Sequence, residues 1–351
     1  MPPAALPEHA AAATSTAPIR SETTPMHSKY PHPMGAASSR YRYRQVVPKR
    51  ARTIVWGVGA LLAGALIAGI AALFAFGSHG GSAVTPTQVQ ANASTSTPPP
   101  PAGAVVLAGE LGSRPVALAV KGNSLTASVL APSGDPESGL KLAFRIGGRS
   151  LPGRPCGPGC YRATATRAPR QVAIALPDGR ASFRIPAATR PGTEVVARAG
   201  RVFRGLRSLV YVESLRSGPT GGLLTTWRMA APDRLSYQIR NGAAAVVIAS
   251  RRWDQARPGA KWVESQSTRL DVPAPTWGAG VTNAHIVGSG TVRGRPVWLV
   301  SFATPSVPAW FTAWIDKRSY RTLQLRMTAA SHFMFHRYTE FNAPLRIKPP
   351  T

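Results

Sequence analysis

The feature that most constrains this chain is an uncharged apolar run at residues 53–77, TIVWGVGALLAGALIAGIAALFAFG. About 20 apolar residues in a helix cross the hydrocarbon core of a bilayer, so this run is long enough to span it with some tilt. A helix buried in a soluble core would carry polar residues on one face, and the run offers no such face. A cleaved signal peptide has a shorter apolar region behind a short basic start, whereas 52 residues precede this longer run. A start at Met26 or Met34 would shorten the preceding region but not the run itself. We therefore predict a transmembrane signal-anchor helix at 53–77.

The flanking charges predict the orientation of this helix. Residues 40–52 hold six Lys or Arg, and residues 78–103 hold none. Positive residues stay on the cytoplasmic side, so residues 1–52 are predicted to be cytoplasmic and everything after residue 77 to lie outside the cytoplasm. The protein would then be a single-pass protein of the cell membrane. A stripe of Ala60, Gly64, Ala68 and Ala72 is typical of helix–helix contacts, so a membrane-protein partner is one alternative. An alanine-rich span also produces such a stripe by chance.

The chain is strongly basic, with 42 Lys and Arg against 14 Asp and Glu and a net charge of +28. The tail 1–52 is too short and too rich in Pro, Ser, Thr and Ala for a nucleic-acid-binding fold. We predict a disordered tail that contacts anionic lipid headgroups and no nucleic acid. The arginines after residue 104 favour an anionic envelope ligand, or they only solvate the surface; both interpretations remain open.

Residues 78–103 are rich in Ser, Thr and Pro and are predicted to form a linker. From 104 to 188, short apolar segments alternate with Gly, Pro and Asp turns at a spacing near ten residues. Leu142, Phe144 and Ile146 show the period of two that is typical of a half-buried strand. We predict a small Ig-like β-sandwich domain at 104–188.

The two cysteines, Cys156 and Cys160, lie in the segment CGPGC. Outside the cytoplasm a disulfide is expected, and the Pro-Gly pair between them allows the tight turn it needs. A thiolate pair for Cu(I) is the alternative. We predict the disulfide.

Residues 189–351 have a different pattern. The segment TRPGTE predicts a helix that begins near Pro191. Its apolar stripe is predicted to consist of Val195, Ala199, Val202, Phe203 and Leu206. The long antiparallel strands that follow predict an α+β domain, in which a curved sheet or incomplete barrel wraps one helix and leaves an apolar cleft. The aromatic residues predicted to line this cleft, or to lie in the core beside it, are Trp227, Tyr237, Trp253, Trp298, Phe302, Trp310 and Trp314.

No common catalytic motif is present, and the few acidic residues are scattered, so we predict that the protein is not an enzyme and needs no cofactor. The segment SHFMFHRY offers one metal-binding alternative. His332, Met334 and His336 share one face of a strand, and imidazole and thioether ligands suit copper, with Met327 as a further ligand. Two structural histidines and a core methionine are the competing interpretation.

The segments TTWRMAAPDRLSYQIR and FTAWIDKRSYRTLQLRM, with a Pro232-Asp233-Arg234 turn and a Trp314–Lys317 hairpin, resemble the lipoprotein-carrier group over residues 189–351. That group includes LolA, LppX and LprG lipoproteins and the N-terminal part of RseB-type sensors. The stretch from CGPGCYRA to NAPL is also similar to soluble regions of actinobacterial copper-resistance proteins of the CopC/CopD type. The resemblance implies a LolA-like domain at 189–351 that binds a lipid or other hydrophobic ligand. An envelope copper-resistance accessory protein and an RseB-like sensor are the alternatives.

Overall fold

The computed structural model describes residues 96–304 and 308–351 of the chain. The predicted tail 1–52, the predicted transmembrane helix 53–77 and most of the predicted linker 78–103 lie outside these residues. Within the described ranges, no helix has the length and apolar character needed to cross a bilayer.

The first part of the described chain forms two antiparallel sheets with the strand orders β1-β2-β3-β7-β6 and β5-β4-β8-β9. Their facing sides meet in one apolar core that includes Leu118, Phe144 and Ile174. Because only alternate side chains face this core, the strands show a period of two in the sequence. The strands are β1 (Val105–Leu111), β2 (Arg114–Lys121), β3 (Ser124–Val129), β4 (Ala143–Ile146), β5 (Arg149–Pro152), β6 (Arg154–Gly157), β7 (Cys160–Thr164), β8 (Gln171–Leu176) and β9 (Gly179–Arg184).

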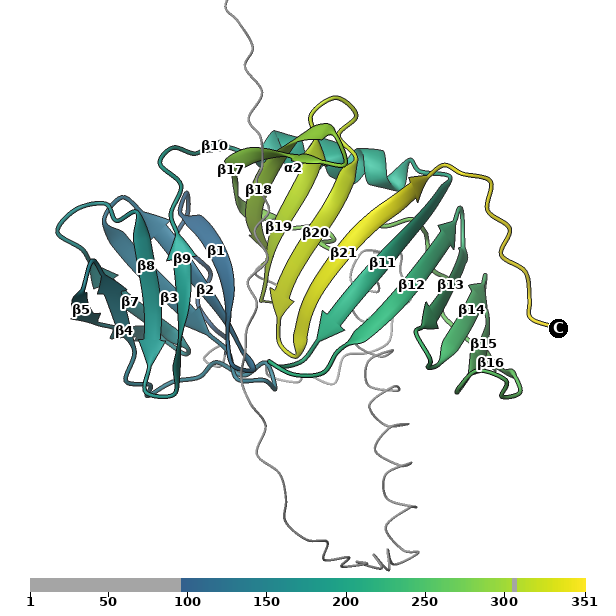
Figure 1. Ribbon diagram of the computed structural model, residues 1–351, viewed down its shortest axis with the longest axis horizontal. Coiled ribbons are helices and arrows are strands. Elements are labelled where there is room, and N and C mark those ends of the chain that lie inside the picture. Colours follow the sequence, from purple (N-terminus) through teal and green to yellow (C-terminus); the bar gives the residue numbers. More distant parts are fainter. Residues whose placement is uncertain (1–95, 305–307) are drawn as a thin grey trace, which may run out of the picture. The chain divides into compact units, whose positions relative to one another are not determined.

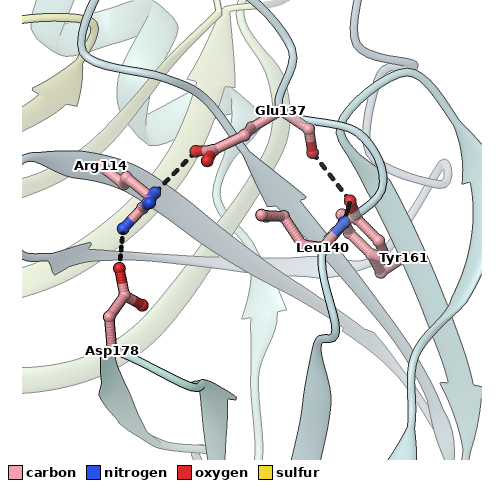
Figure 2. A network of polar contacts seen from close by, with 5 residues as sticks. All are labelled: Arg114, Glu137, Leu140, Tyr161 and Asp178. Carbon is pink, nitrogen blue, oxygen red and sulfur yellow. Dashed lines mark hydrogen bonds and ion pairs between the residues drawn. The ribbon is translucent and has the colours of Figure 1, made fainter.

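A polar network fixes the long connection between β3 and β4 (Figure 2). Arg114 donates through Nε to the Glu137 carboxylate at 2.7 Å and through Nη1 to Asp178 at 2.5 Å. The Tyr161 hydroxyl donates to the Glu137 carbonyl oxygen at 2.8 Å and accepts from the Leu140 N–H at 2.9 Å. The network therefore gives partners to backbone groups in a connection that lacks a regular ladder.

The second part of the chain forms one open sheet of twelve antiparallel strands, in the order β10-β17-β18-β19-β20-β21-β11-β12-β13-β14-β15-β16. Figure 1 shows this sheet as a continuous curved surface. The predicted mainly β architecture, with one helix in the described residues and an open curved sheet, is confirmed. The strands are β10 (Arg190–Pro191), β11 (Ser208–Arg216), β12 (Leu223–Ala230), β13 (Arg234–Ile239), β14 (Ala244–Ile248), β15 (Arg251–Gln255), β16 (Val263–Gln266), β17 (Thr282–Val292), β18 (Arg295–Thr304), β19 (Ala309–Asp316), β20 (Thr322–Ala329) and β21 (His332–Phe341).

The helix α2 (Thr193–Arg204) begins two residues later than predicted. Pro191 is not its first residue but pairs with His285 in the short strand β10. Gly192 is the N-cap, and a Cβ at this position would lie 2.8 Å from the Val300 side chain. The prediction failed because a close approach to the sheet, and not the proline, sets where the helix begins.

The buried face of α2 is also rotated from the predicted stripe. Ala199 and Phe203 are buried as predicted, whereas Val202 is only partly buried. The buried residues of the helix are Val196, Ala199, Gly200 and Phe203. Leu206, just beyond the helix, is buried as well.

We call the face of the twelve-stranded sheet that carries Trp227 and Phe302 the inner face, and the opposite face the outer face. The inner face holds the largest apolar core, which includes residues from α2. Residues 267–281, which we call the crossover segment, connect β16 to β17 and also pack on this core through Val272 and Trp277. The Trp277 ring lies 5.9 Å from Phe203 and 5.8 Å from Phe302. The cover of the inner face is therefore one short helix and one irregular segment.

The outer face contacts the two-sheet part of the chain. Trp310 and Ala303 share a small apolar cluster with Val106 and Ala117. The Ser301 hydroxyl donates to the carbonyl oxygen of Val106. Because its second face is covered in this way, β2 is buried along nearly its whole length.

Candidate ligand-binding site

Four of the seven predicted cleft residues lie on the inner face. Trp227, Tyr237 and Phe302 are buried members of its core. Trp298 is partly buried at the edge of the same core, with its ring 5.2 Å from Tyr320. The space between sheet and cover is filled by these side chains.

The other three predicted cleft residues lie on the outer face, because each is at the opposite position of the strand alternation. Trp253 donates through Nε1 to Glu264 at 3.1 Å. Trp310 lies in the cluster shared with the two-sheet part, and Trp314 makes an edge contact with Phe335 at 5.9 Å. These three tryptophans therefore cannot line a cleft on the inner face.

The inner face carries a row of four aromatic residues that runs across the strands. Strand register places Tyr338 opposite Tyr211, Tyr211 opposite Trp227, and Trp227 opposite Tyr237. The ring centroids of successive members are 5.2, 6.0 and 4.8 Å apart. We call these residues the aromatic row. Each ring combines a large apolar surface with one polar atom, a combination that suits contact with an amphipathic ligand.

One polar atom of the aromatic row is buried without a partner. This atom is the indole Nε1 of Trp227, whose residue is 5% exposed. An unpaired buried donor costs about 1–3 kcal/mol, so such groups call for an explanation. A ligand oxygen that accepts from this N–H would remove the cost.

Beside the aromatic row lies a buried, hydrogen-bonded pair of polar side chains. His336 Nε2 is 2.9 Å from the Glu213 carboxylate, and their side chains are 1% and 3% exposed. His336 Nδ1 is 3.1 Å from the Tyr338 hydroxyl. Burial raises the pKa of Tyr338, so this hydroxyl stays protonated. The pair therefore joins β11 and β21 through buried polar contacts.

The candidate copper ligands also lie on the inner side of β21. Their burial follows the strand alternation, with Met334 and His336 buried and His332 partly buried. Both ring nitrogens of His336 are engaged by Glu213 and Tyr338, as described above. Among the residues that the structure describes, no three His, Cys, Asp or Glu side chains gather as a metal site.

The predicted disulfide between Cys156 and Cys160 is confirmed. It closes the hairpin between β6 and β7, where Gly159 has the positive φ that the turn requires. Since both thiols are used, the alternative thiolate pair for Cu(I) is excluded.

A shallow hollow of about 450 Å³ lies away from the inner face, at the ends of β8 and β9. Its lining includes Arg170, Arg184 and Pro186.

No family model matches the chain, and no curated protein matches it. Among solved structures, the chain is similar to the Mycobacterium tuberculosis lipoprotein LppX, with 15% identity and a TM-score of 0.36 over 44% of this chain and 97% of that one. It is similar to LprF from Mycobacterium bovis, with 13% identity and a TM-score of 0.34 over 45% and 96%. A LolA superfamily protein from Nitrosomonas europaea matches with 7% identity and a TM-score of 0.23 over 46% and 96%. Each of these matches covers less than half of this chain.

Proposed function

We propose that this chain is a non-enzymatic binding protein that holds a lipid or other hydrophobic ligand between the inner face and its cover. The observation that carries the proposal is the contrast between the inner face and the cover. The inner face bears a large apolar core to which most strands of the sheet contribute. Its cover, in contrast, is one short helix and the irregular crossover segment. An irregular segment with few backbone hydrogen bonds loosens at low free-energy cost, so the crossover segment can admit a ligand between itself and the inner face.

The aromatic row supports a ligand with at least one oxygen acceptor near its acyl chains. Burial of each CH₂ group contributes about 0.8 kcal/mol, so long chains supply most of the affinity. Met229, Met327 and Met334 on the same face adapt to chains of different shape. The Trp227 N–H would then fix the position of an ester or hydroxyl oxygen.

The same proposal places the binding domain outside the cytoplasm, anchored by the predicted helix at 53–77. The disulfide supports an oxidising compartment, because such bonds rarely persist in the cytosol. The sensor alternative depends on residues 1–52, which lie outside the described residues.

Retention of a defined lipid by the full-length chain tests the proposal. The chain is purified in detergent, incubated with dioleoylglycerol and examined by native mass spectrometry. We expect one bound lipid in the wild type. Trp227→Phe keeps a ring but removes the donor, so we expect about 2- to 13-fold weaker retention, the effect of one neutral hydrogen bond.

Trp314→Phe is the matched control, because the same change is made on the outer face, and retention should equal that of the wild type. No bound lipid in the wild type would contradict the proposal. Equal losses in both variants would contradict the assignment of the ligand to the inner face.

A further inference from the structure

The hairpin between β20 and β21 holds one imidazole with a preset tautomer. His332 Nδ1 lies 2.7 Å from the carbonyl oxygen of Ala330. A carbonyl only accepts, so Nδ1 carries the hydrogen and the neutral ring keeps its lone pair on Nε2. That Nε2 is buried and has no partner. Histidine ligands of metal ions typically donate their other ring N–H to a carbonyl in this way.

Two thioethers lie on the same face near this imidazole. Met334 follows His332 by two residues, so strand alternation gives both the same face. Met327 is directly opposite Met334 in the register of β20 and β21, and both methionines belong to the inner core. Ala329, opposite His332, carries only a methyl group as its side chain.

The residue types of this cluster select a soft ion. Imidazole and thioether ligands are neutral, and thioethers prefer Cu(I) over harder divalent ions. His336 cannot join the cluster because Glu213 and Tyr338 hold both of its ring nitrogens. We propose that His332 Nε2 and the sulfurs of Met327 and Met334 form a three-coordinate site for Cu(I).

The number of tightly bound Cu(I) ions tests the site. The full-length chain in detergent is titrated with Cu(I) without oxygen, with bicinchoninate as the competing ligand. We expect His332→Ala to bind one tight equivalent fewer than the wild type. His285→Ala is the matched control, since His285 also has a buried unpartnered ring nitrogen but no methionine opposite it in the register, and it should bind as the wild type does. Histidines and methionines in residues 1–95 contribute equally to all variants and cancel in the difference.

A second variant tests the site without changing His332, so that lost binding is not mistaken for a disturbed hairpin. Met334→Leu conserves the volume of the side chain, and we expect it to weaken Cu(I) binding at least tenfold while the circular dichroism spectrum is unchanged. X-ray absorption should give two sulfur ligands in the wild type and one in the variant. Equal numbers of Cu(I) ions in the wild type and His332→Ala, or a wild-type spectrum without sulfur ligands, would overturn the proposal. Lipid retention by His332→Ala is expected to stay normal, which separates this site from the proposed function.

Discussion

The buried pair of Glu213 and His336 gives the sharpest stability prediction, through Glu213→Ala. Both side chains are almost fully buried, and His336 Nε2 lies 2.9 Å from the Glu213 carboxylate. Removal of one partner of a buried pair leaves the other polar group without compensation, at a cost of about 3–5 kcal/mol. For a folded unit of this size each kcal/mol lowers the melting temperature by about 2–4 °C, so we expect a decrease of roughly 6–20 °C.

Thermal unfolding followed by tryptophan fluorescence measures this effect on the full-length chain. Glu340→Ala is the control, because Glu340 lies on β21, the strand of His336, with an exposed side chain, and it should change the transition little. The double variant Glu213→Leu/His336→Phe should recover most of the loss, since apolar replacement of a whole buried pair is often nearly neutral. A loss below about 1 kcal/mol in Glu213→Ala, the range of exposed pairs, would refute the reasoning.

Three further predictions concern the remainder of the described chain. Burial lowers the pKa of His285, so the stability that this neutral ring contributes is complete above its ordinary pKa of about 6.5 and falls as the pH drops below it. In urea unfolding between about pH 7 and pH 5, His285→Phe should therefore lose less stability than the wild type. The same dependence of unfolding free energy on pH in both proteins would contradict this. Reduction of the Cys156–Cys160 bond, which closes a loop of sequence separation 4, should cost about 2 kcal/mol by denaturant titration, and a cost near zero would refute the entropic argument. Gly192→Ala places a methyl group 2.8 Å from the Val300 side chain and should cost about 1–3 kcal/mol, whereas wild-type stability would show that α2 shifts freely.

Most strands could be predicted because the chain alternates apolar and polar residues wherever one face is buried. Val172, Ile174 and Leu176 are buried, as this pattern indicates. Strand β17 does not follow a simple alternation, because its register shifts twice, between Thr282 and His285 and between Ile286 and Gly288.

The candidate site was harder to predict because it depends on pairing between distant segments. Tyr338 joins the aromatic row only because β11 pairs with β21, more than a hundred residues further along the chain. Alternation within each strand separates the inner tryptophans from the outer ones, but the sequence does not say which parity faces the helix. Glu213 was overlooked, although it lies at the same parity as Leu209, Tyr211 and Leu215, which marks it as a buried acid.

The strand order gives the crossover segment a mechanical character of its own. The chain runs from β11 to one free edge of the sheet at β16, and it starts again near the opposite edge at β17. The crossover segment is therefore held by a strand at each end. A segment held at both ends cannot rotate away from the sheet as a hinged lid does; it can only loosen along its length. A ligand would then have to enter from the side, between the segment and the inner face, so elongated molecules would enter more readily than bulky round ones.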